Sequence, residues 1–227
     1  MSSEKTSNKF FGDIGIDGLS KILPSGRQAE DIKLVKKLCK KSDKILDLAC
    51  GYGRVTIPIA KLGYDITGMD LLPKYIKKAK LNTRKAKLKI QFDIGSMLRL
   101  PYKKDSFDKI LCLWTSFSYI LKKSEQIKAL NEIFRVLRPN GIAFIDTFDG
   151  DNTAIKLLLK EEGQGVEKRL LFLDYDIELN AIVHGTLHYV HDRKSLANIC
   201  KASKFKHFIV GFKNMYGGRR LAVYLNK

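Results

Sequence analysis

A glycine loop that follows an apolar strand carries the first residues able to bind a ligand. The segment ILDLACGYGR, residues 45–54, is apolar or small up to Gly51 and Gly53 and holds one carboxylate, Asp47. Glycines at a strand end bring backbone N–H groups close to a nucleotide-like ligand, since no side chain holds the ligand off. A dinucleotide fingerprint needs a third glycine at the position of Thr56. The carboxylate suits a ligand with an ammonium group and a positive centre better than it suits a pyrophosphate.

A second carboxylate stands at the end of the next expected strand. Asp70 follows Asp47 by 23 residues and closes the segment YDITGMD. An acidic residue at this place can accept hydrogen bonds from both hydroxyls of a ribose. A ligand that has a cationic amino-acid end and a ribose is S-adenosylmethionine. The two carboxylates together therefore predict S-adenosylmethionine as the cofactor.

The elements that must position these residues alternate between strand and helix. Short β-branched runs separated by helical patterns are typical of a parallel sheet with helices on both faces. The strands expected in the first two thirds of the chain cover residues 44–50, 64–70, 88–94, 107–114 and 141–148.

Three helices can be predicted between or before these strands. The clearest covers 124–141 and has an apolar stripe at three- and four-residue spacing, with Ser124 as its N-cap and Pro139 with Gly141 at its end. An amphipathic helix is expected at 27–41. Another is expected to begin near Arg54, where a proline in the first turn costs little because the first N–H groups are unpaired anyway.

The pattern changes after residue 150. Residues 169–179 and 181–190 are expected to form a hairpin, followed by a helix from about Asp192. Two further strands, 206–213 and 219–225, flank the turn NMYGG. Consecutive strands joined by a short turn pair antiparallel.

Four segments together resemble the class I S-adenosylmethionine-dependent methyltransferases. They are the loop D-x-A-C-G-x-G at Asp47–Gly53, the acidic Asp70, GSMLRLPY (95–102) before SFDKILCLW (106–114), and RVLRPNGIAFID (135–146). They follow the order and spacing of the family over residues 44–148, whereas any one of them alone would be a weak indication.

The resemblance implies the fold class and the organisation of the chain. The expected fold is α/β, Rossmann-like and doubly wound, with a mostly parallel seven-stranded sheet, an antiparallel last strand and a small β-hairpin insertion before the last two strands. The chain is expected to be a single methyltransferase domain, residues 1–227. Its expected parts are an N-terminal helical cap (1–43), a cofactor-binding core (44–148), a hairpin insertion over the acceptor side (165–190) and a closing helix and strand pair (191–227).

The resemblance also implies which residues bind the cofactor. The methionine end is expected beside the glycine loop, the ribose beside the second carboxylate, and the adenine beside the residues that follow the second and third strands. The implied set is Asp47, Ala49, Gly51, Tyr52, Gly53, Asp70, Leu71, Ser96, Met97 and Leu113.

The chain departs from the family at one of these positions. The family often has an acidic residue six positions before the aromatic residue of LPY, where it accepts a hydrogen bond from the adenine amino group. Ser96 occupies that position here, and Asp93 lies three residues too early to replace it. We therefore expect Ser96, and not Asp93, beside the adenine.

The methyl acceptor is expected at the segment LWTSFSY, residues 113–119, because ligands of open parallel sheets lie at the carboxyl ends of the strands. The segment lacks an N-P-P-Y motif and is similar to the S-F-G-Y of small-molecule methyltransferases, some of which act on amines. Trp114, Ser116 and Tyr119 are candidates for the acceptor side. An aromatic wall there can bind a cation, or the rings can simply pack in the core.

Two histidines of the expected hairpin are further candidates. His184 and His188 are four residues apart and therefore share one face of a strand. A histidine there can act as a general base, whereas the alternative is a solvated strand face. Two such residues do not make a metal site without a third ligand, and the four scattered cysteines contain no C-x-x-C pair, so no metal is expected.

Composition limits the function classes. The 227 residues carry a formal net charge of +18, and the stretches 74–89 and 201–227 contain no acidic residue. Such stretches favour either a nucleic-acid footprint or a lysine-rich solvated surface. No secretory signal is present at the start and no apolar run is long enough to span a membrane, so a cytoplasmic protein without a membrane partner is expected.

The expected function is transfer of a methyl group from S-adenosylmethionine to N or O of a small-molecule acceptor by in-line displacement. Two alternatives remain open: an RNA methyltransferase, acting on tRNA or rRNA through the basic surface, and a non-catalytic module that binds S-adenosylmethionine. The sequence pattern does not specify the acceptor or the oligomeric state.

Overall fold

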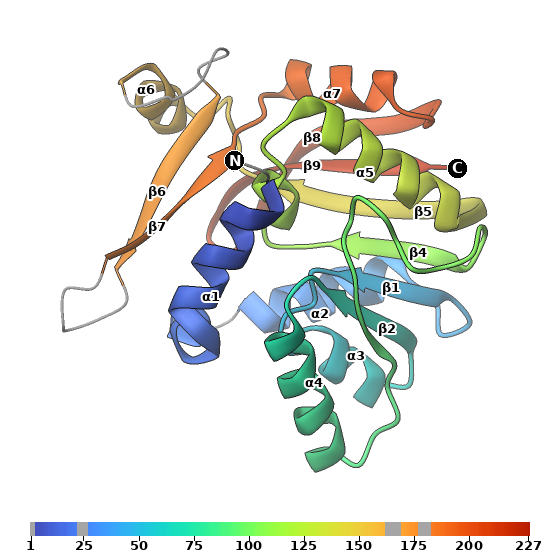
Figure 1. Ribbon diagram of the computed structural model, residues 1–227. Helices are drawn as coiled ribbons and strands as arrows, with labels where there is room; N and C mark the ends of the chain where they lie inside the picture. Colours follow the sequence, from blue (N-terminus) through green and yellow to red (C-terminus); the bar gives the residue numbers. More distant parts are fainter. Residues whose placement is uncertain (1–2, 22–26, 162–168, 177–182) are drawn as a thin grey trace.

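The computed structural model describes residues 3–21, 27–161, 169–176 and 183–227. Seven strands form one sheet in the order β3-β2-β1-β4-β5-β9-β8, and two more form a separate hairpin (Figure 1). The strands of the main sheet are β1 (Lys44–Leu48), β2 (Asp65–Asp70), β3 (Phe92–Ile94), β4 (Phe107–Cys112), β5 (Leu137–Thr147), β8 (His207–Met215) and β9 (Gly218–Asn226).

The strand directions confirm the expected fold class. β1 pairs in parallel with β2 and β4, β2 with β3, and β4 with β5. β9 pairs antiparallel with both β5 and β8. The sheet is therefore mostly parallel with one antiparallel strand, and the carboxyl ends of β1, β2, β4 and β5 meet at one edge of the molecule.

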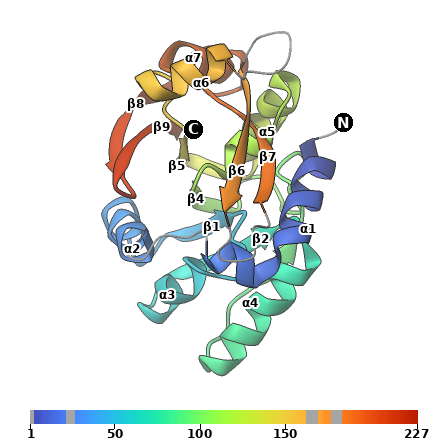
Figure 2. The same cartoon turned by 90° about the vertical axis from the view of Figure 1, so that its left-hand side faces the viewer.

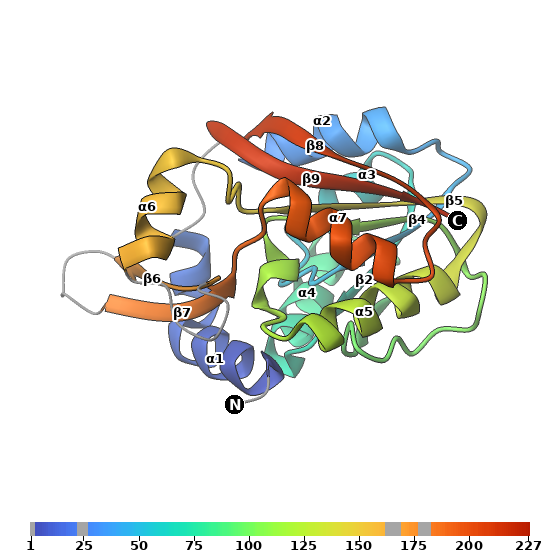
Figure 3. The ribbon, with the colours of Figure 1, turned by 90° about the horizontal axis from the view of Figure 1, so that it is seen from above.

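Helices cover both faces of the sheet (Figure 3). Alternate side chains of β1 separate the two cores: Ile45 packs with α2 and α3, whereas Leu46 packs with α5 and α7. The helices that follow the N-terminal helix are α2 (Arg27–Leu38), α3 (Thr56–Lys61), α4 (Pro73–Lys85), α5 (Lys123–Val136), α6 (Thr153–Glu161) and α7 (Arg193–Ala202).

Two predicted features of α5 were wrong. The helix ends at Val136 and β5 begins at once, so Pro139 and Gly141 lie inside the strand and do not end the helix. Leu137 is fully buried and pairs with Phe107, so tertiary burial decides its conformation. The ladder between β4 and β5 is interrupted beyond this pair, where a proline without an N–H group is tolerated.

The start of α5 also differs from the prediction. The residue before the helix is Lys122, which makes no side-chain cap, so Ser124 is not the N-cap. Other predicted boundaries shift inward as well; among them, α2 ends at Leu38, α3 begins at Thr56, and β3 is reduced to Phe92–Ile94. The predicted helix after Asp192 is confirmed, with Asp192 and Ser195 forming a reciprocal capping box at its start.

Helix α1 (Ser3–Lys21) and the hairpin lie beside the carboxyl ends of the parallel strands (Figures 1 and 2). The hairpin consists of β6 (Leu170–Asp176) and β7 (Val183–Tyr189), paired antiparallel as predicted. β7 and the short 3-10 helix η1 (Ser116–Tyr119) both contact α1. These elements enclose the sheet edge where the sequence places the ligand.

The described residues also bear on a membrane-spanning helix and on disulfide bonds. Among the described residues, no helix combines the length and apolar character that crossing a membrane requires. All four cysteines, Cys39, Cys50, Cys112 and Cys200, are buried and free.

Candidate functional site

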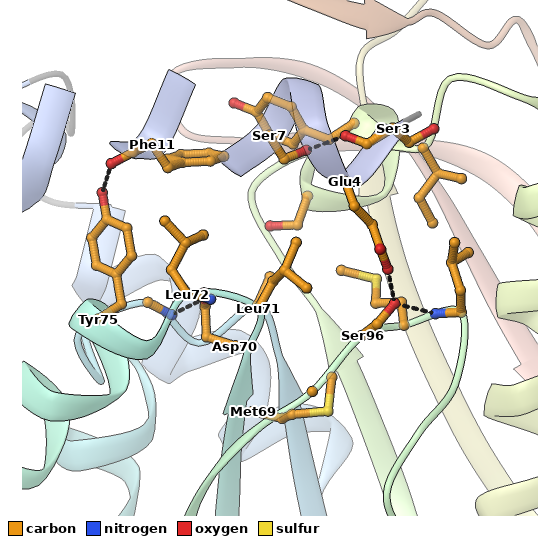
Figure 4. A pocket seen from close by; sticks show the side chains of 18 of the residues that line it. Ser3, Glu4, Ser7, Phe11, Met69, Asp70, Leu71, Leu72, Tyr75 and Ser96 are labelled. Atoms are coloured by element: carbon orange, nitrogen blue, oxygen red, sulfur yellow. Dashed lines mark hydrogen bonds between the residues drawn. The ribbon is translucent and has the colours of Figure 1, made fainter. Parts of the chain in front are cut away.

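A cavity lies beneath α1 at the carboxyl ends of β1, β2 and β4 (Figure 4). Its empty space, including the open solvent at its mouth, is about 880 Å³, and it is lined mainly by apolar groups, with a few polar side chains among them. A second cavity of about 400 Å³ shares Leu19, Ala49, Gly51, Trp114 and Ser116 with the first. The two cavities therefore form one continuous site, large enough for a ligand that has a nucleoside part and a smaller extension.

The expected cofactor residues divide between the two parts of this site. Nine of the ten line it, and the tenth, Gly53, lies behind the glycine loop. The larger part is lined by Ala49, Gly51, Asp70, Leu71, Ser96 and Met97, and the smaller part by Asp47, Ala49, Gly51, Tyr52 and Leu113.

Asp70, the last residue of β2, joins the glycine loop to the start of α4. One carboxylate oxygen accepts a hydrogen bond from the N–H group of Gly51 at 2.9 Å, and the other accepts from the N–H group of Leu72 at 3.0 Å. Burial raises the pKa of Asp70, and the backbone donors oppose that rise. The carboxylate thus holds two walls of the larger cavity at a fixed separation.

Asp47 lies at the smaller cavity, and its partner explains a feature of the sequence. The hydroxyl of Thr56 donates a hydrogen bond to Asp47 over 2.6 Å. Thr56 is the residue that replaces the third glycine of a dinucleotide fingerprint, so this position holds a carboxylate in place instead of opening space for a pyrophosphate. Burial raises the pKa of Asp47 to about 7, although the hydrogen bond from Thr56 lowers it.

Gly53 is required by packing behind the loop. Its φ is +84°, and a Cβ atom there would lie 2.8 Å from Cδ1 of Ile57 and 3.3 Å from Cζ of Phe92. By contrast, a Cβ atom on Gly51 would meet only Leu19, at 4.0 Å. Gly51 therefore borders the open site, whereas Gly53 lets the loop pack onto α3.

Ser96 contacts a residue that the sequence did not suggest. Its hydroxyl donates a hydrogen bond to the carboxylate of Glu4 on α1, and its oxygen accepts one from the N–H group of Leu98 at 3.0 Å (Figure 4). Asp93 instead accepts from the hydroxyl of Tyr102 at 3.0 Å and does not line the site. No local pattern indicates Glu4, which lies 92 residues before Ser96 in the chain.

The turn after β4 is held in an unusual backbone conformation. Trp114 and Thr115 both have positive φ, 56° and 58°, which non-glycine residues seldom adopt. Asp146 at the end of β5 accepts from the N–H group of Trp114 at 2.6 Å and from that of Thr115 at 3.3 Å. Arg220 donates to the same carboxylate at 2.9 Å. This buried ion pair therefore places Trp114 and Ser116 on the wall of the site.

The ring of Trp114 already has a cation beside it. The guanidinium of Arg27 lies 5.2 Å from the centre of this ring and 5.4 Å from the ring of Tyr216. Within the described ranges, Arg27 has no carboxylate in an ion pair, whereas Arg54 nearby pairs with Asp31. The face of Trp114 toward Arg27 is thus not open to a cationic acceptor.

The structure describes the side chain of only one of the two candidate histidines, His188. His188 is fully buried, and its Nδ1 lies 2.9 Å from the hydroxyl of Ser118, so it does not belong to a solvated strand face. Its ring packs 4.5 Å from that of Tyr119, which does line the site. Burial lowers the pKa of His188 to about 3, which keeps it neutral at pH 7. The backbone of His184 lies in β7, but its side chain is outside the described part of the chain.

The first basic stretch forms the outer face of α4. Its inner positions Tyr75, Ile76 and Ala79 are buried, whereas Lys77 and Lys80 point to solvent. In the portion of the chain that the structure describes, no three His, Cys, Asp or Glu side chains are grouped as metal ligands would be.

Comparison with known proteins finds similarity over the middle of the chain, which contributes most of the residues of this site. Residues 45–141 match the family model described as "Methyltransferase domain". The ubiquinone biosynthesis O-methyltransferase of Pelagibacter ubique is 34% identical over 109 residues, covering 48% of this chain and 43% of that protein. The demethylmenaquinone methyltransferase of Lactobacillus johnsonii is 33% identical over 133 residues, covering 55% and 52%. The chain spans about half the length of the curated relatives it matches.

A solved structure extends the likeness of fold to the whole chain. The magnesium protoporphyrin IX methyltransferase of Synechocystis, determined with bound SAH (S-adenosylhomocysteine), superposes with a TM-score of 0.70 at 15% identity and covers 99% of each chain. At this identity the comparison shows the shared fold alone.

We expect the buried pair of Asp146 and Arg220 to be critical for stability. Asp146→Asn should lower the free energy of unfolding by about 3 kcal/mol or more, because it leaves the Arg220 guanidinium buried without its counter-charge. Urea denaturation of the purified protein measures the loss. The control is Asp108→Asn, which breaks the partly exposed pair with Arg138 and should cost less than about 1 kcal/mol. Equal losses for the two variants would contradict the role given to Asp146.

Proposed function

We propose that the chain is a class I S-adenosylmethionine-dependent methyltransferase and that it transfers a methyl group from S-adenosylmethionine to a nitrogen or oxygen atom of a small-molecule acceptor. The observation that carries the proposal is the position of two buried carboxylates along one continuous site, Asp47 at its smaller part and Asp70 at its larger part. The order of these two carboxylates along the site fits a ligand with an ammonium group at one end and a ribose in the middle.

The residues present fit this cofactor at each of its charged or polar groups. Asp47 offers a carboxylate to the ammonium group, and Asp70 offers one to the ribose hydroxyls. The methionine carboxylate needs a cation: Arg54 lines the smaller part of the site, and Arg27 lies beside Trp114 and lines neither part. Leu71 and Met97 supply apolar surface for the adenine ring.

When bound, S-adenosylmethionine supplies an electrophilic methyl group on a sulfonium centre. The chain's own residues then have to orient the acceptor and exclude water, which provides much of the acceleration of an in-line displacement. Leu19 covers the glycine loop, while Trp114 and Tyr119 form apolar walls. The hydroxyl of Ser116 donates to the carbonyl of Leu113 at 2.8 Å, so its oxygen can accept a hydrogen bond from an acceptor N–H or O–H group.

A small acceptor is favoured by the enclosure of the site. Helix α1, η1 and the hairpin stand over the strand ends, so the acceptor must enter among them (Figure 2). The relatives from Pelagibacter and Lactobacillus carry names that refer to ubiquinone biosynthesis and demethylmenaquinone. RNA as the acceptor is the second candidate, and the net charge of +18 is the observation that favours it.

Methyl transfer from labelled S-adenosylmethionine to a metabolite extract and to bulk RNA tests this function. Label in the small-molecule fraction is the expected result. Label in RNA, with binding that weakens steeply as salt increases, would instead support the second candidate. Binding of S-adenosylmethionine without transfer to either pool would identify a non-catalytic binding module.

Replacement of Asp70 should weaken cofactor binding while the fold persists. We expect Asp70→Ala to raise the Kd of S-adenosylhomocysteine about 10- to 150-fold, because the ribose hydroxyls lose a charged acceptor. Isothermal titration calorimetry measures the change. The control is Asp65→Ala at the exposed amino end of the same strand, which should leave the Kd unchanged. An unchanged Kd in Asp70→Ala would contradict the ribose assignment.

The raised pKa of Asp47 predicts a pH dependence of binding. In the free protein this carboxyl is mostly protonated below its pKa of about 7, whereas the ammonium group of the cofactor favours the ionised form. Affinity for S-adenosylhomocysteine should therefore fall about tenfold as the pH decreases from 8 to 6, and binding near pH 7 should release a proton. Asp47→Asn should bind more weakly and lose the pH dependence. A wild-type Kd that is constant over this range would refute the prediction.

A further inference from the structure

We propose that Glu4, on helix α1, recognises the 6-amino group of the adenine, so that α1 selects the base of the cofactor as well as covering it. The inference rests on the proposed function, because it presupposes a cofactor that contains adenine. It assigns a specificity-determining role to a residue outside the segment that matches the family model, which covers residues 45–141.

The first step concerns the hydrogen-bonding groups at this end of the site. The loop of residues 95–102 contains no carboxylate, and Asp93 is engaged with Tyr102 and Gln91 outside the cavity. The proton of the Ser96 hydroxyl is directed to Glu4, and its oxygen already accepts from Leu98. Ser96 therefore holds the carboxylate of Glu4 in position.

The second step concerns the carboxylate of Glu4 itself. Only its Oε1 accepts from Ser96, so within the described chain Oε2 is available for another donor. Figure 4 shows this side chain reaching from α1 toward Ser96 over the cavity. The nearby lining residues Leu71, Met97 and Leu98 are apolar. A charged acceptor in such surroundings gains most from an N–H donor, and an exocyclic amino group supplies one.

The third step is that α1 is fixed from both sides, which gives Glu4 a defined position. At its first turn, the hydroxyl of Ser3 accepts from the N–H group of Leu121 at 2.8 Å and donates to Glu125. Further along, the hydroxyl of Tyr75 donates to the carbonyl of Gly15 at 3.0 Å, and the ammonium of Lys74 donates to that of Gly12 at 2.6 Å. The helix is thus tied to the start of α5 and to α4 across the cavity.

The chemistry of the base provides a sharp test. S-inosylhomocysteine has a carbonyl oxygen in place of the 6-amino group of S-adenosylhomocysteine and a proton on N1, where adenine has a lone pair, and is the same molecule elsewhere. A carboxylate facing that position attracts the amino group and repels the carbonyl oxygen. The wild-type protein should therefore bind S-adenosylhomocysteine at least about tenfold more tightly than S-inosylhomocysteine.

The experiment measures the Kd of both ligands by calorimetry for the wild type, Glu4→Ala, Glu4→Gln and Glu125→Gln. Glu4→Ala should weaken the binding of S-adenosylhomocysteine about tenfold, while the binding of S-inosylhomocysteine stays the same or becomes tighter. The preference for S-adenosylhomocysteine should therefore disappear. Glu4→Gln should reduce the preference, because an amide can also donate to the carbonyl oxygen. Glu125→Gln is the matched control, since it alters the other carboxylate that contacts the first turn of α1 and lies outside the cavity lining.

Two results would overturn the inference while leaving the proposed function standing. One is a Glu4→Ala protein that keeps the wild-type preference between the two ligands. The other is an equal loss of affinity for both ligands, which would mean that Glu4 only stabilises the cover. Failure of the wild type to bind S-adenosylhomocysteine would overturn the proposed function together with the inference. Circular dichroism of each variant verifies that the helices remain folded.

Discussion

The site depends on buried carboxylates at the ends of parallel strands. Asp47, Asp70 and Asp146 end or nearly end β1, β2 and β5, and all three are almost fully buried. A carboxylate removed from water is costly unless donors surround it, and here the donors come from the neighbouring loops. Asp70 binds Gly51, and Asp146 binds the N–H group of Trp114. The loops that form the cavity are therefore shaped by the strands from which they emerge.

This dependence links stability to the geometry of the site. The positive φ values of Trp114 and Thr115 are unfavourable for residues with side chains and persist because Asp146 accepts from both of their N–H groups. Arg220 on β9 neutralises that carboxylate, so the antiparallel strand contributes to a turn that it does not adjoin in sequence. The pairing of β9 with β5 brings these two charges together, with Asp146 opposite Ala222 in the ladder.

How far the sequence predicts the molecule depends on the range of each interaction. The sheet, the hairpin and the carboxylates Asp47 and Asp70 could be predicted because strand periodicity and strand-end positions are local patterns. The boundary between α5 and β5 could not, since pairing of Leu137 with Phe107 decides it. The contact between Ser96 and Glu4 joins positions 92 residues apart, and no spacing rule relates them. The hydrogen bond from Thr56 to Asp47 could not be predicted for another reason. The dinucleotide fingerprint marks position 56 only as lacking a glycine and gives no indication of what a hydroxyl there would bind.

The cavity is lined partly by the segment that matches the family model and partly by residues outside that segment. The matched segment, residues 45–141, supplies the ends of β1, β2 and β4 and the loops that follow them. Helix α1 and the hairpin lie outside that segment, yet both stand at the same edge of the sheet (Figure 1). Phe11 and Leu19 of α1 complete the cavity together with Tyr119 of η1. Because α1 lines the cavity and lies outside the matched segment, the shape of the cavity depends on a part of the chain that the family model does not cover.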